Sequence, residues 1–156
     1  SLEVHKSQKD WAAWFAENGA DLVLGTHPHV IEPIEVLGGG EESGGAKGGT
    51  LVFYSLGNFV NWTSGTGQGV ANRMVGAMAQ VTIGLDNEGR AVVKDYGAEP
   101  LVCHVETGFG GVTVYPLGKY TEELAARNEI RLQDGSFSLD YCRNLVEEVL
   151  GTAAVY

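Results

Sequence analysis

The sequence of 156 residues is poor in cysteine and has no long hydrophobic run. Its two cysteines, Cys103 and Cys142, are too few for a disulfide framework and are not spaced as a zinc knuckle. We expect two buried free thiols, with a single disulfide as the alternative, so the redox compartment stays open. No apolar run approaches the ~20 residues of a membrane-spanning helix, and no signal peptide is visible. The chain opens at Ser1 without an initiator Met, which favours a fragment of a longer protein.

Positive charge is also scarce. The chain has 10 basic and 20 acidic residues, giving a formal net charge of −10. Because nucleic-acid binding needs a basic face to neutralise phosphates, no nucleic-acid partner is expected. The same balance disfavours anionic membranes and polyanionic polymers, unless a metal ion or a local basic pocket reverses the field. The content of 44% hydrophobic and 19% charged residues is typical of a globular protein, and the length fits one domain.

The hydrophobic pattern alternates between helical and strand spacing, which predicts an α/β fold with mixed sheets and a largely antiparallel second half. We expect helices over residues 7–18, 120–127 and 138–150. We expect strands over residues 20–24, 31–37, 50–56, 73–85, 90–105 and 112–116. The turn between the two long strands, at residues 86–89, has the Asp-Asn-Glu-Gly composition of a hairpin.

Two further segments carry structural predictions. Trp11, Trp14 and Phe15 recur at helical spacing, which favours packing against the core. Residues 38–49 contain seven glycines in twelve residues, and we expect a mobile surface loop there. This tract lacks the Walker pattern of a phosphate-binding loop.

The segment Gly25-Thr26-His27-Pro28-His29 directly follows a short apolar run and is the strongest functional signal. Open α/β sheets bind ligands at the carboxyl ends of their strands, and neutral imidazole is the commonest protein metal ligand. His27 and His29 are therefore candidate metal ligands. The alternative is a polar turn whose histidines cap backbone groups.

Asn58 is the second candidate, because it follows a predicted strand and Gly57 and could point to the same edge as the histidines. There it would orient a neighbouring group or a substrate oxygen. The alternative is a turn asparagine with positive φ that bonds its own backbone. Tyr54 and Ser55 alternate faces on that strand, and one of them is expected in the core. Ser55 lacks the G-x-S-x-G elbow and a nearby base, which argues against a nucleophile.

The remaining polar candidates have simpler explanations. His104 is expected to be a half-buried strand residue, with an approach to the same edge as the alternative. Glu32 and Glu35 are expected to be exposed loop carboxylates, although either could support the histidines. His5 is expected in solvent, and Asp21 is expected to cap or turn the chain at the opposite end of the strand from His27.

Two segments in this order, GADLVLGTHPHV at residues 19–30 and YSLGNFV at residues 54–60, resemble a known family. They are similar to the bacterial capsule-synthesis proteins of the poly-γ-glutamate biosynthesis family (capsule protein A). Members of that family typically carry GADLVIG-x-HPHV followed by I-x-YSLGNF. The later strands and the Val114–Leu117 stretch also follow the layout of the family, so the resemblance covers most of the chain.

The resemblance implies a fold and a chemistry. The family is similar to the calcineurin-like metallophosphatases, which have a four-layer α/β/β/α sandwich and a two-metal site. Residues 1–156 would then be a single domain that forms the C-terminal portion of such a sandwich. His27 and His29 would be the last histidine pair of the ligand set, and Asn58 would act beside them. Manganese, zinc or iron would activate a water for attack on a phosphoryl or acyl centre.

The sequence also departs from the metallophosphatase pattern. The Asp-bearing, Asp-rich and Asn-His segments that begin the pattern are absent, and Thr26 stands where many relatives have another histidine. The isolated chain is therefore expected to hold an incomplete metal site and to be inactive.

The implied partners are the missing N-terminal half of the same protein and the subunits of a polymer synthesis and export complex. The implied location is the outer face of a bacterial membrane or the cell surface. Exposed strand edges could also drive formation of a homodimer. The alternative function is a non-catalytic scaffold or assembly subunit of that complex. An unrelated α/β hydrolase fragment is a third possibility, and the lack of a nucleophile motif argues against it.

Overall fold

The computed structural model describes residues 2–42, 45–61, 65, 67 and 69–156. The first sheet contains β1 (Leu22–Leu24), β5 (Thr50–Phe53) and β2 (Ile34–Leu37), in the order β1-β5-β2. β1 is parallel to β5, whereas β2 is antiparallel to it. All four residues of β5 are buried, which explains why this central strand reads as a continuous apolar run. β1 forms one edge of the sheet, because β5 is its only neighbour among the described strands.

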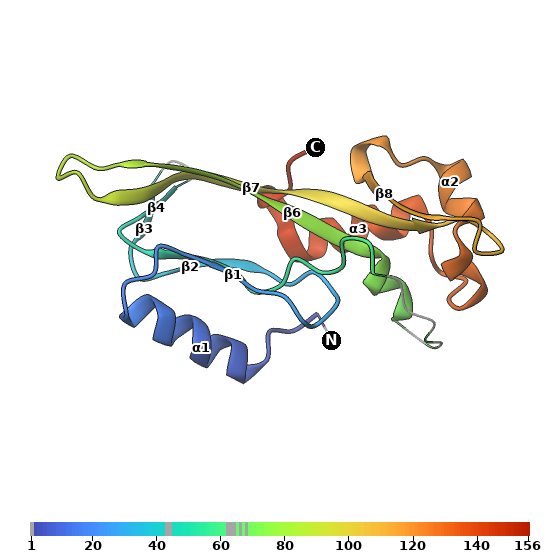
Figure 1. The fold of residues 1–156 in the computed structure, drawn as a ribbon, viewed down its shortest axis with the longest axis horizontal. Helices are drawn as coiled ribbons and strands as arrows, with labels where there is room; N and C mark the ends of the chain where they lie inside the picture. Colours follow the sequence, from blue (N-terminus) through green and yellow to red (C-terminus); the bar gives the residue numbers. More distant parts are fainter. Residues whose placement is uncertain (1, 43–44, 62–64, 66, 68) are drawn as a thin grey trace.

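Helix α1 (Lys6–Glu17) covers one face of this sheet (Figure 1). It begins with a capping box, in which the His5 ring accepts from the Ser7 backbone and the Gln8 side chain accepts from the His5 backbone. The contact with the sheet is made by Ala12, which is buried against Val52 and Tyr54.

The prediction that the aromatic residues of α1 pack into the core is wrong. Trp11, Trp14 and Phe15 are 61%, 51% and 39% exposed. Their rings lie 5.4 to 6.0 Å apart and contact one another. The physical reason is that α1 approaches the narrow sheet through the small residue Ala12, so the aromatic side of the helix has no partner among the described residues.

The second sheet is antiparallel, with the order β6-β7-β8, and consists of β6 (Val75–Leu85), β7 (Ala91–Val105) and β8 (Val112–Pro116). β6 and β7 form the predicted long hairpin, with a register shift between Thr82 and Ile83. The hairpin lies over the face of the first sheet that α1 leaves free (Figure 1). An edge-to-face contact between Phe53 and Tyr96, with ring centroids 6.5 Å apart, joins the two sheets.

The prediction of a loop over residues 38–49 is also wrong. β3 (Gly40–Glu42) and β4 (Gly45–Lys47) form a two-stranded antiparallel hairpin, and β4 contacts β7. The glycine content removes side-chain packing from this segment but leaves its peptide groups free to pair. Backbone hydrogen bonds therefore order a segment that composition alone assigns to a loop.

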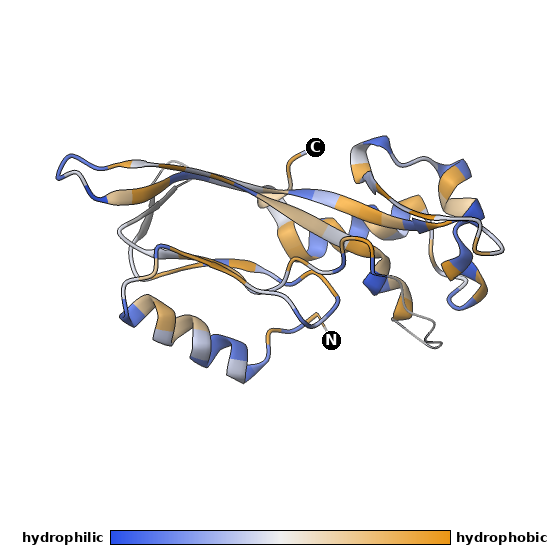
Figure 2. Cartoon of the chain, in the orientation of Figure 1, coloured by the Kyte–Doolittle hydropathy of each residue, from blue (hydrophilic) through white to orange (hydrophobic). Residues whose placement is uncertain are grey.

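The C-terminal part packs helices against the second sheet. α2 (Glu122–Arg127) and α3 (Leu139–Leu150) begin at the N-caps Thr121 and Ser138, close to the predicted boundaries. The described residues also form four short 3₁₀ helices: η1 (Val70–Met74), η2 (Leu117–Lys119), η3 (Glu129–Leu132) and η4 (Gly151–Ala153). α3 buries the predicted apolar stripe in the main core, and Figure 2 shows hydrophobic residues along β7 and α3.

Cys103 and Cys142 are buried free thiols in this core, as predicted. Burial raises the pKa of Cys103 to about 11 and that of Cys142 to about 12. Both thiols therefore stay protonated and unreactive at neutral pH.

The architecture is α/β, with a mixed first sheet and an antiparallel second half, as the sequence predicts. α1, the first sheet and the second sheet follow one another as layers (Figure 1). Among the described residues, no helix combines the length and the apolar character that crossing a bilayer requires.

Candidate functional site

The His-Pro-His loop leaves the end of β1 where the backbone passes very close to the strand β5. The Gly25 amide donates to the Phe53 carbonyl at 2.7 Å. A Cβ atom on Gly25 would lie only 2.1 Å from the Tyr54 carbonyl oxygen. Only glycine fits here, so Gly25 fixes the point at which the chain turns into the loop.

Both histidines adopt backbone conformations that are rare for residues with a side chain. His27 has φ of 104° and His29 has φ of 64°, and both side chains are exposed. Such strained conformations cost free energy and are most often found at functional sites. The two imidazole rings lie 6.5 Å apart between centroids, with an angle of 41° between their planes. The loop therefore presents two imidazoles side by side to solvent.

Asn58 joins this loop through a direct hydrogen bond. Its side chain is buried, and its Oδ1 lies 2.8 Å from Nδ1 of His29. Its Nδ2 donates to the Arg73 carbonyl at 2.9 Å. The close approach depends on Gly76, because a Cβ atom there would lie 1.9 Å from the Asn58 carbonyl oxygen. Asn58 is not among the described residues with positive φ, so the alternative of a left-handed turn asparagine does not apply.

These contacts define the state of His29. The Arg73 carbonyl can only accept, so the amide nitrogen of Asn58 faces it and the amide oxygen faces the ring. Nδ1 of His29 must then carry the proton, and the lone pair resides on Nε2. Metal-binding histidines are commonly held in one tautomer by a hydrogen bond of this kind. Asn58 is thus a positioning residue for His29.

The loop carries two imidazole side chains of a type that binds metal ions in proteins. Imidazoles are suitable ligands for zinc, iron or nickel, whereas manganese also requires carboxylate ligands. Since a ligating nitrogen lies about 2 Å from zinc, two rings sharing one tetrahedral ion would have to lie closer than the observed 6.5 Å. Within the part of the chain that the structure describes, no three His, Cys, Asp or Glu residues are grouped to hold an ion. The residues present fit two ligands of a larger set, on one ion after a small ring movement or on two neighbouring ions.

A hollow of about 640 Å³ opens beside His27. It is lined by residues of the N-terminal segment, the start of α1 and the loop, among them His5, Gln8, Thr26, His27 and Glu32. His5 is exposed, as predicted, and caps α1. This hollow is large enough for a small polar ligand next to the His27 imidazole.

The prediction that Glu32 is an exposed loop carboxylate is wrong. Its side chain is buried, and Gln8 donates a hydrogen bond to it. Burial raises the pKa of Glu32, while the bond from Gln8 opposes that effect. The reason for the burial is that α1 folds over the segment after the loop, a contact between residues 24 positions apart in sequence.

The other residues considered from sequence have structural partners. The Tyr54 hydroxyl donates to Glu35 at 2.8 Å. Burial raises the pKa of Tyr54 above its usual range, and the hydrogen bond to Glu35 raises it further. Ser55 is buried, and its hydroxyl accepts from the Gly57 amide. Asp21 lies at the start of β1, at the opposite end from His27, and lines a separate hollow of about 910 Å³.

His104 is fully buried in a polar network on β7 rather than half-buried. Asn128 donates to the Tyr120 hydroxyl at 3.1 Å, so that hydroxyl can donate to Nδ1 of His104 at 2.8 Å. Nε2 of His104 then donates to Glu106 at 3.2 Å. Every donor in this chain has an acceptor, and none of these contacts involves His27 or His29. His104 therefore belongs to the packing of the second sheet.

Sequence reasoning missed three contributors to the loop: Gln8, Glu32 as a buried group, and the Arg73 carbonyl. Gln8 gave a signal, because an N3 glutamine in a capping box predicts where the helix starts and hence which residues lie next to it. The Arg73 carbonyl gave none, since a backbone oxygen is the same at every position.

Comparisons with known proteins match the part of the chain that carries the His-Pro-His loop. Residues 1–63 match the family model of the bacterial capsule synthesis protein PGA_cap. A similar curated protein is the PGA biosynthesis protein CapA of Bacillus subtilis (strain 168), which is 46% identical over 59 residues. These residues are 36% of this chain and 13% of that protein, so the chain spans a small part of its relative. No solved structure matches the chain. Over residues 1–63, which include the His-Pro-His loop and Asn58, the chain is similar to the bacterial capsule synthesis protein family PGA_cap.

Proposed function

We propose that this chain is the C-terminal part of a bacterial capsule (poly-γ-glutamate) biosynthesis protein, and that His27 and His29 contribute to a metallophosphatase-like metal site. The observation that carries the proposal is the hydrogen bond between Asn58 and His29, which is itself anchored on the Arg73 carbonyl. A buried amide that fixes one tautomer of an exposed histidine has a purpose at a ligand site and little purpose at a solvated turn.

Each residue of the site has a role in this proposal. Nε2 of His29 offers a fixed lone pair, and His27 offers a second imidazole at the edge of the hollow. Asn58 holds His29 without touching a ligand itself. A bound divalent ion, manganese, zinc or iron, would supply a Lewis acid that lowers the pKa of a water molecule. The reaction class would be hydrolysis at a phosphoryl or acyl centre.

The site is completed in this proposal by further donors from the rest of the same protein. Two imidazoles alone do not make a ligand set for catalysis, which in known zinc enzymes has three protein ligands. Residues 1–156 would form one domain unit together with the missing N-terminal half, and the isolated chain would be inactive. The whole protein would act at the bacterial cell surface, with the subunits of a polymer synthesis and export complex as partners.

A non-catalytic scaffold in the same complex is the second candidate. It is favoured by the two-imidazole donor set of the described residues and by the net charge of −10, which repels an anionic polymer. The two candidates differ in what metal removal does. A scaffold keeps its partners and has no activity to lose, whereas the metal-site proposal predicts hydrolysis by the longer protein that a chelator abolishes.

The direct test is metal content after equilibrium dialysis against zinc and against manganese. The wild-type chain is compared with the double variant His27→Ala/His29→Ala. We expect bound metal in the wild type and its loss in the double variant. The matched control is His5→Asn, which removes another exposed histidine and keeps an N-cap. Metal bound equally by the wild type and the double variant would contradict the proposal, whereas no metal in either form would show that this chain is not a metal site by itself.

A further inference from the structure

The short helix that anchors Asn58 is itself held by the C-terminal part of the chain. The Arg73 carbonyl, which accepts from Nδ2 of Asn58, lies near the end of η1, directly before β6. A 3₁₀ helix as short as η1 has few internal hydrogen bonds, so contacts with other elements decide where its last carbonyl groups lie. The position of the Asn58 amide therefore depends on what holds η1.

Tyr141 on α3 holds η1 through a side-chain hydrogen bond. Its hydroxyl donates to Oδ1 of Asn72, the residue before Arg73, across 69 positions of the sequence. Burial raises the pKa of Tyr141 to about 12, so the hydroxyl keeps its proton at neutral pH and stays a donor. Because Asn72 and Arg73 are consecutive, a bond that fixes Asn72 also restricts the Arg73 carbonyl.

Asp134, which lies shortly after η3, holds the start of η1. Its carboxylate accepts from the Ser136 hydroxyl and from the backbone amides of Ala71 and Gly69. These bonds, first the one from Ser136, hold the pKa of Asp134 below its usual range, so the carboxylate is ionised at neutral pH. The N-cap of η1 is Gly69, which has no side chain to cap the helix. Asp134 supplies the missing acceptor from another part of the chain.

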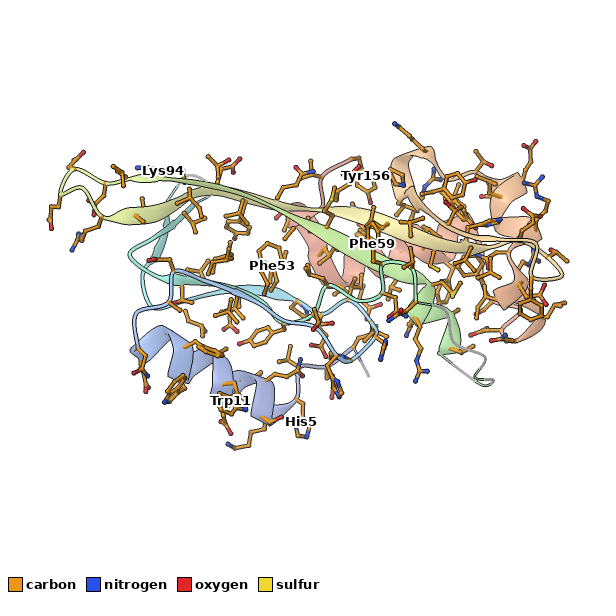
Figure 3. All side chains as sticks on the ribbon, in the orientation of Figure 1. His5, Trp11, Phe53, Phe59, Lys94 and Tyr156 are labelled. Carbon is orange, nitrogen blue, oxygen red and sulfur yellow. The ribbon has the colours of Figure 1, made fainter. Side chains whose placement is uncertain are left out.

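Buried side chains attach η1 to the main core. Ala71 and Met74 belong to this core together with Phe53 of β5 and Cys142 of α3. Phe53 lies between the first sheet and the β6–β7 hairpin (Figure 3). Since protein cores are closely packed, η1 can make only small movements. Small movements still matter here, because the strength of a hydrogen bond falls steeply with distance and angle.

We propose that Tyr141 and Asn72 are positioning residues for His29. They hold η1 where the Arg73 carbonyl fixes the amide of Asn58, and thereby the tautomer of the ring. The proposal rests on the proposed function, since it takes His29 to be a metal ligand. When the carbonyl moves away, the Asn58 side chain can turn over and present its amide nitrogen to Nδ1. The proton of the neutral imidazole then resides on Nε2, the atom that would otherwise bind the ion.

The test is nitrogen-15 NMR spectroscopy of the histidine side chains in the metal-free chain, at about pH 8, where an ordinary imidazole is neutral. The chemical shifts of the two ring nitrogens report which one carries the proton. We expect wild-type His29 to be protonated at Nδ1. Tyr141→Phe, which removes only a hydroxyl, and Asn72→Ala are each expected to shift the His29 signals toward the Nε2-protonated form. Metal affinity is expected to fall about 3- to 10-fold, less than when a residue bonded directly to the ligand is lost.

The matched control is Tyr120→Phe. It also removes a tyrosine hydroxyl that is bonded to an asparagine, but its network contains Asn128 and His104 instead of Asn58 and His29. We expect Tyr120→Phe to lower the free energy of unfolding and to leave the His29 signals and the metal affinity as in the wild type. Circular dichroism and urea unfolding establish that each variant is folded and how much stability it loses.

Three results would overturn the proposal. One is an unchanged His29 spectrum in folded Tyr141→Phe and Asn72→Ala. The second is an equal shift in Tyr120→Phe, because general loosening of the fold would then explain the effect. The third is wild-type His29 protonated at Nε2.

The metal dialysis is a separate measurement. A wild-type chain that binds no metal, but whose His29 tautomer still depends on Tyr141, would remove the metal site alone. Bound metal together with an unchanged His29 tautomer in Tyr141→Phe would remove the positioning role alone.

Discussion

The first sheet with its His-Pro-His loop and the second sheet with its helices place their histidines in opposite environments. Around the loop, two histidines are exposed on a strained backbone and large aromatic rings face solvent. In the second region, His104 is buried with every donor matched to an acceptor, and the apolar stripe of α3 is covered. Each region has a buried asparagine next to a histidine. Asn58 bonds directly to the exposed His29, whereas Asn128 bonds to the Tyr120 hydroxyl that contacts the buried His104.

This difference indicates that the two regions have different roles. The second region buries the polar network of His104 and the apolar stripe of α3. It also exposes hydrophobic side chains such as Ile83 and Leu132, and among the described residues the side-chain oxygen of Gln133 is buried without a hydrogen-bond partner. The first region leaves both ligand donors and apolar surface unused, which is the state of a surface that binds something else. The family match covers residues 1–63 and ends before the second sheet.

The largest effect is expected from closing the gap at Gly25. Gly25→Ala would force a Cβ atom against the Tyr54 carbonyl, which lies on backbone and cannot move aside as a side chain would. We expect a loss of about 3 kcal/mol in the free energy of unfolding, because overpacking at this point separates β1 from β5. Urea unfolding measures it.

The matched control is Gly111→Ala. Nothing lies within 4 Å of a Cβ atom on Gly111, and the residue belongs to the second region. We expect a change within about 0.5 kcal/mol there. Equal losses in the two variants would show that the crowding at Gly25 is relieved by movement of the loop.

The two asparagines provide the sharpest comparison. Asn128→Ala removes bonds to the Cys103 carbonyl, the Tyr120 hydroxyl and the Ile130 amide. We expect it to cost about 2 to 3 kcal/mol of unfolding free energy and to leave metal affinity unchanged, because three buried groups each lose one hydrogen-bond partner. Asn58→Ala is expected to cost less stability but to weaken metal binding by about 10- to 100-fold, since His29 loses its orienting partner.

Chemical unfolding and metal titration on both variants form the measurement. Each variant is the control for the other, because both remove a buried amide side chain, from a direct contact with His29 in one region and from the network of His104 in the other. A stability loss with unchanged metal affinity in Asn58→Ala would make that residue purely structural and would end the division between the two regions.

The sequence predicted the features of the fold that depend on neighbouring residues. The α/β order, the long hairpin and the caps of the helices follow from periodicity and turn chemistry. The association of the His-Pro-His loop with Asn58 also followed, because both segments come after neighbouring strands of one sheet.

The features that the sequence did not predict depend on contacts between residues that are far apart in the sequence. Periodicity placed Trp11, Trp14 and Phe15 on one side of a helix, but it could not tell whether a second element covers that side. Glu32 was judged by its neighbours in sequence, whereas its environment is set by Gln8 on α1. In both cases the error arose in the first region, where the local pattern and the tertiary contacts disagree.

The smallest expected effect concerns the carboxyl of Glu32, which is buried beside the loop. Its pKa is raised by burial, so the folded chain binds a proton at Glu32 more tightly than the unfolded chain does. The contribution of Glu32 to stability is therefore greatest at pH values below the ordinary glutamate pKa of 4.5 and is lost as the pH rises through the raised value. At neutral pH the buried negative charge of Glu32 lowers the free energy of unfolding.

Glu32→Gln keeps the size of the side chain and its bond with Gln8 but cannot ionise. We expect the variant to be more stable than the wild type by less than about 1 kcal/mol at pH 7, with the difference vanishing near pH 4. Urea unfolding across that pH range measures it, and Glu88→Gln in the exposed turn of the second region is the control that changes little at any pH. If Glu32→Gln were instead less stable at pH 7, the ionised carboxylate would be stabilised at the loop by a cation. The two regions would then also differ in how they stabilise a buried charge.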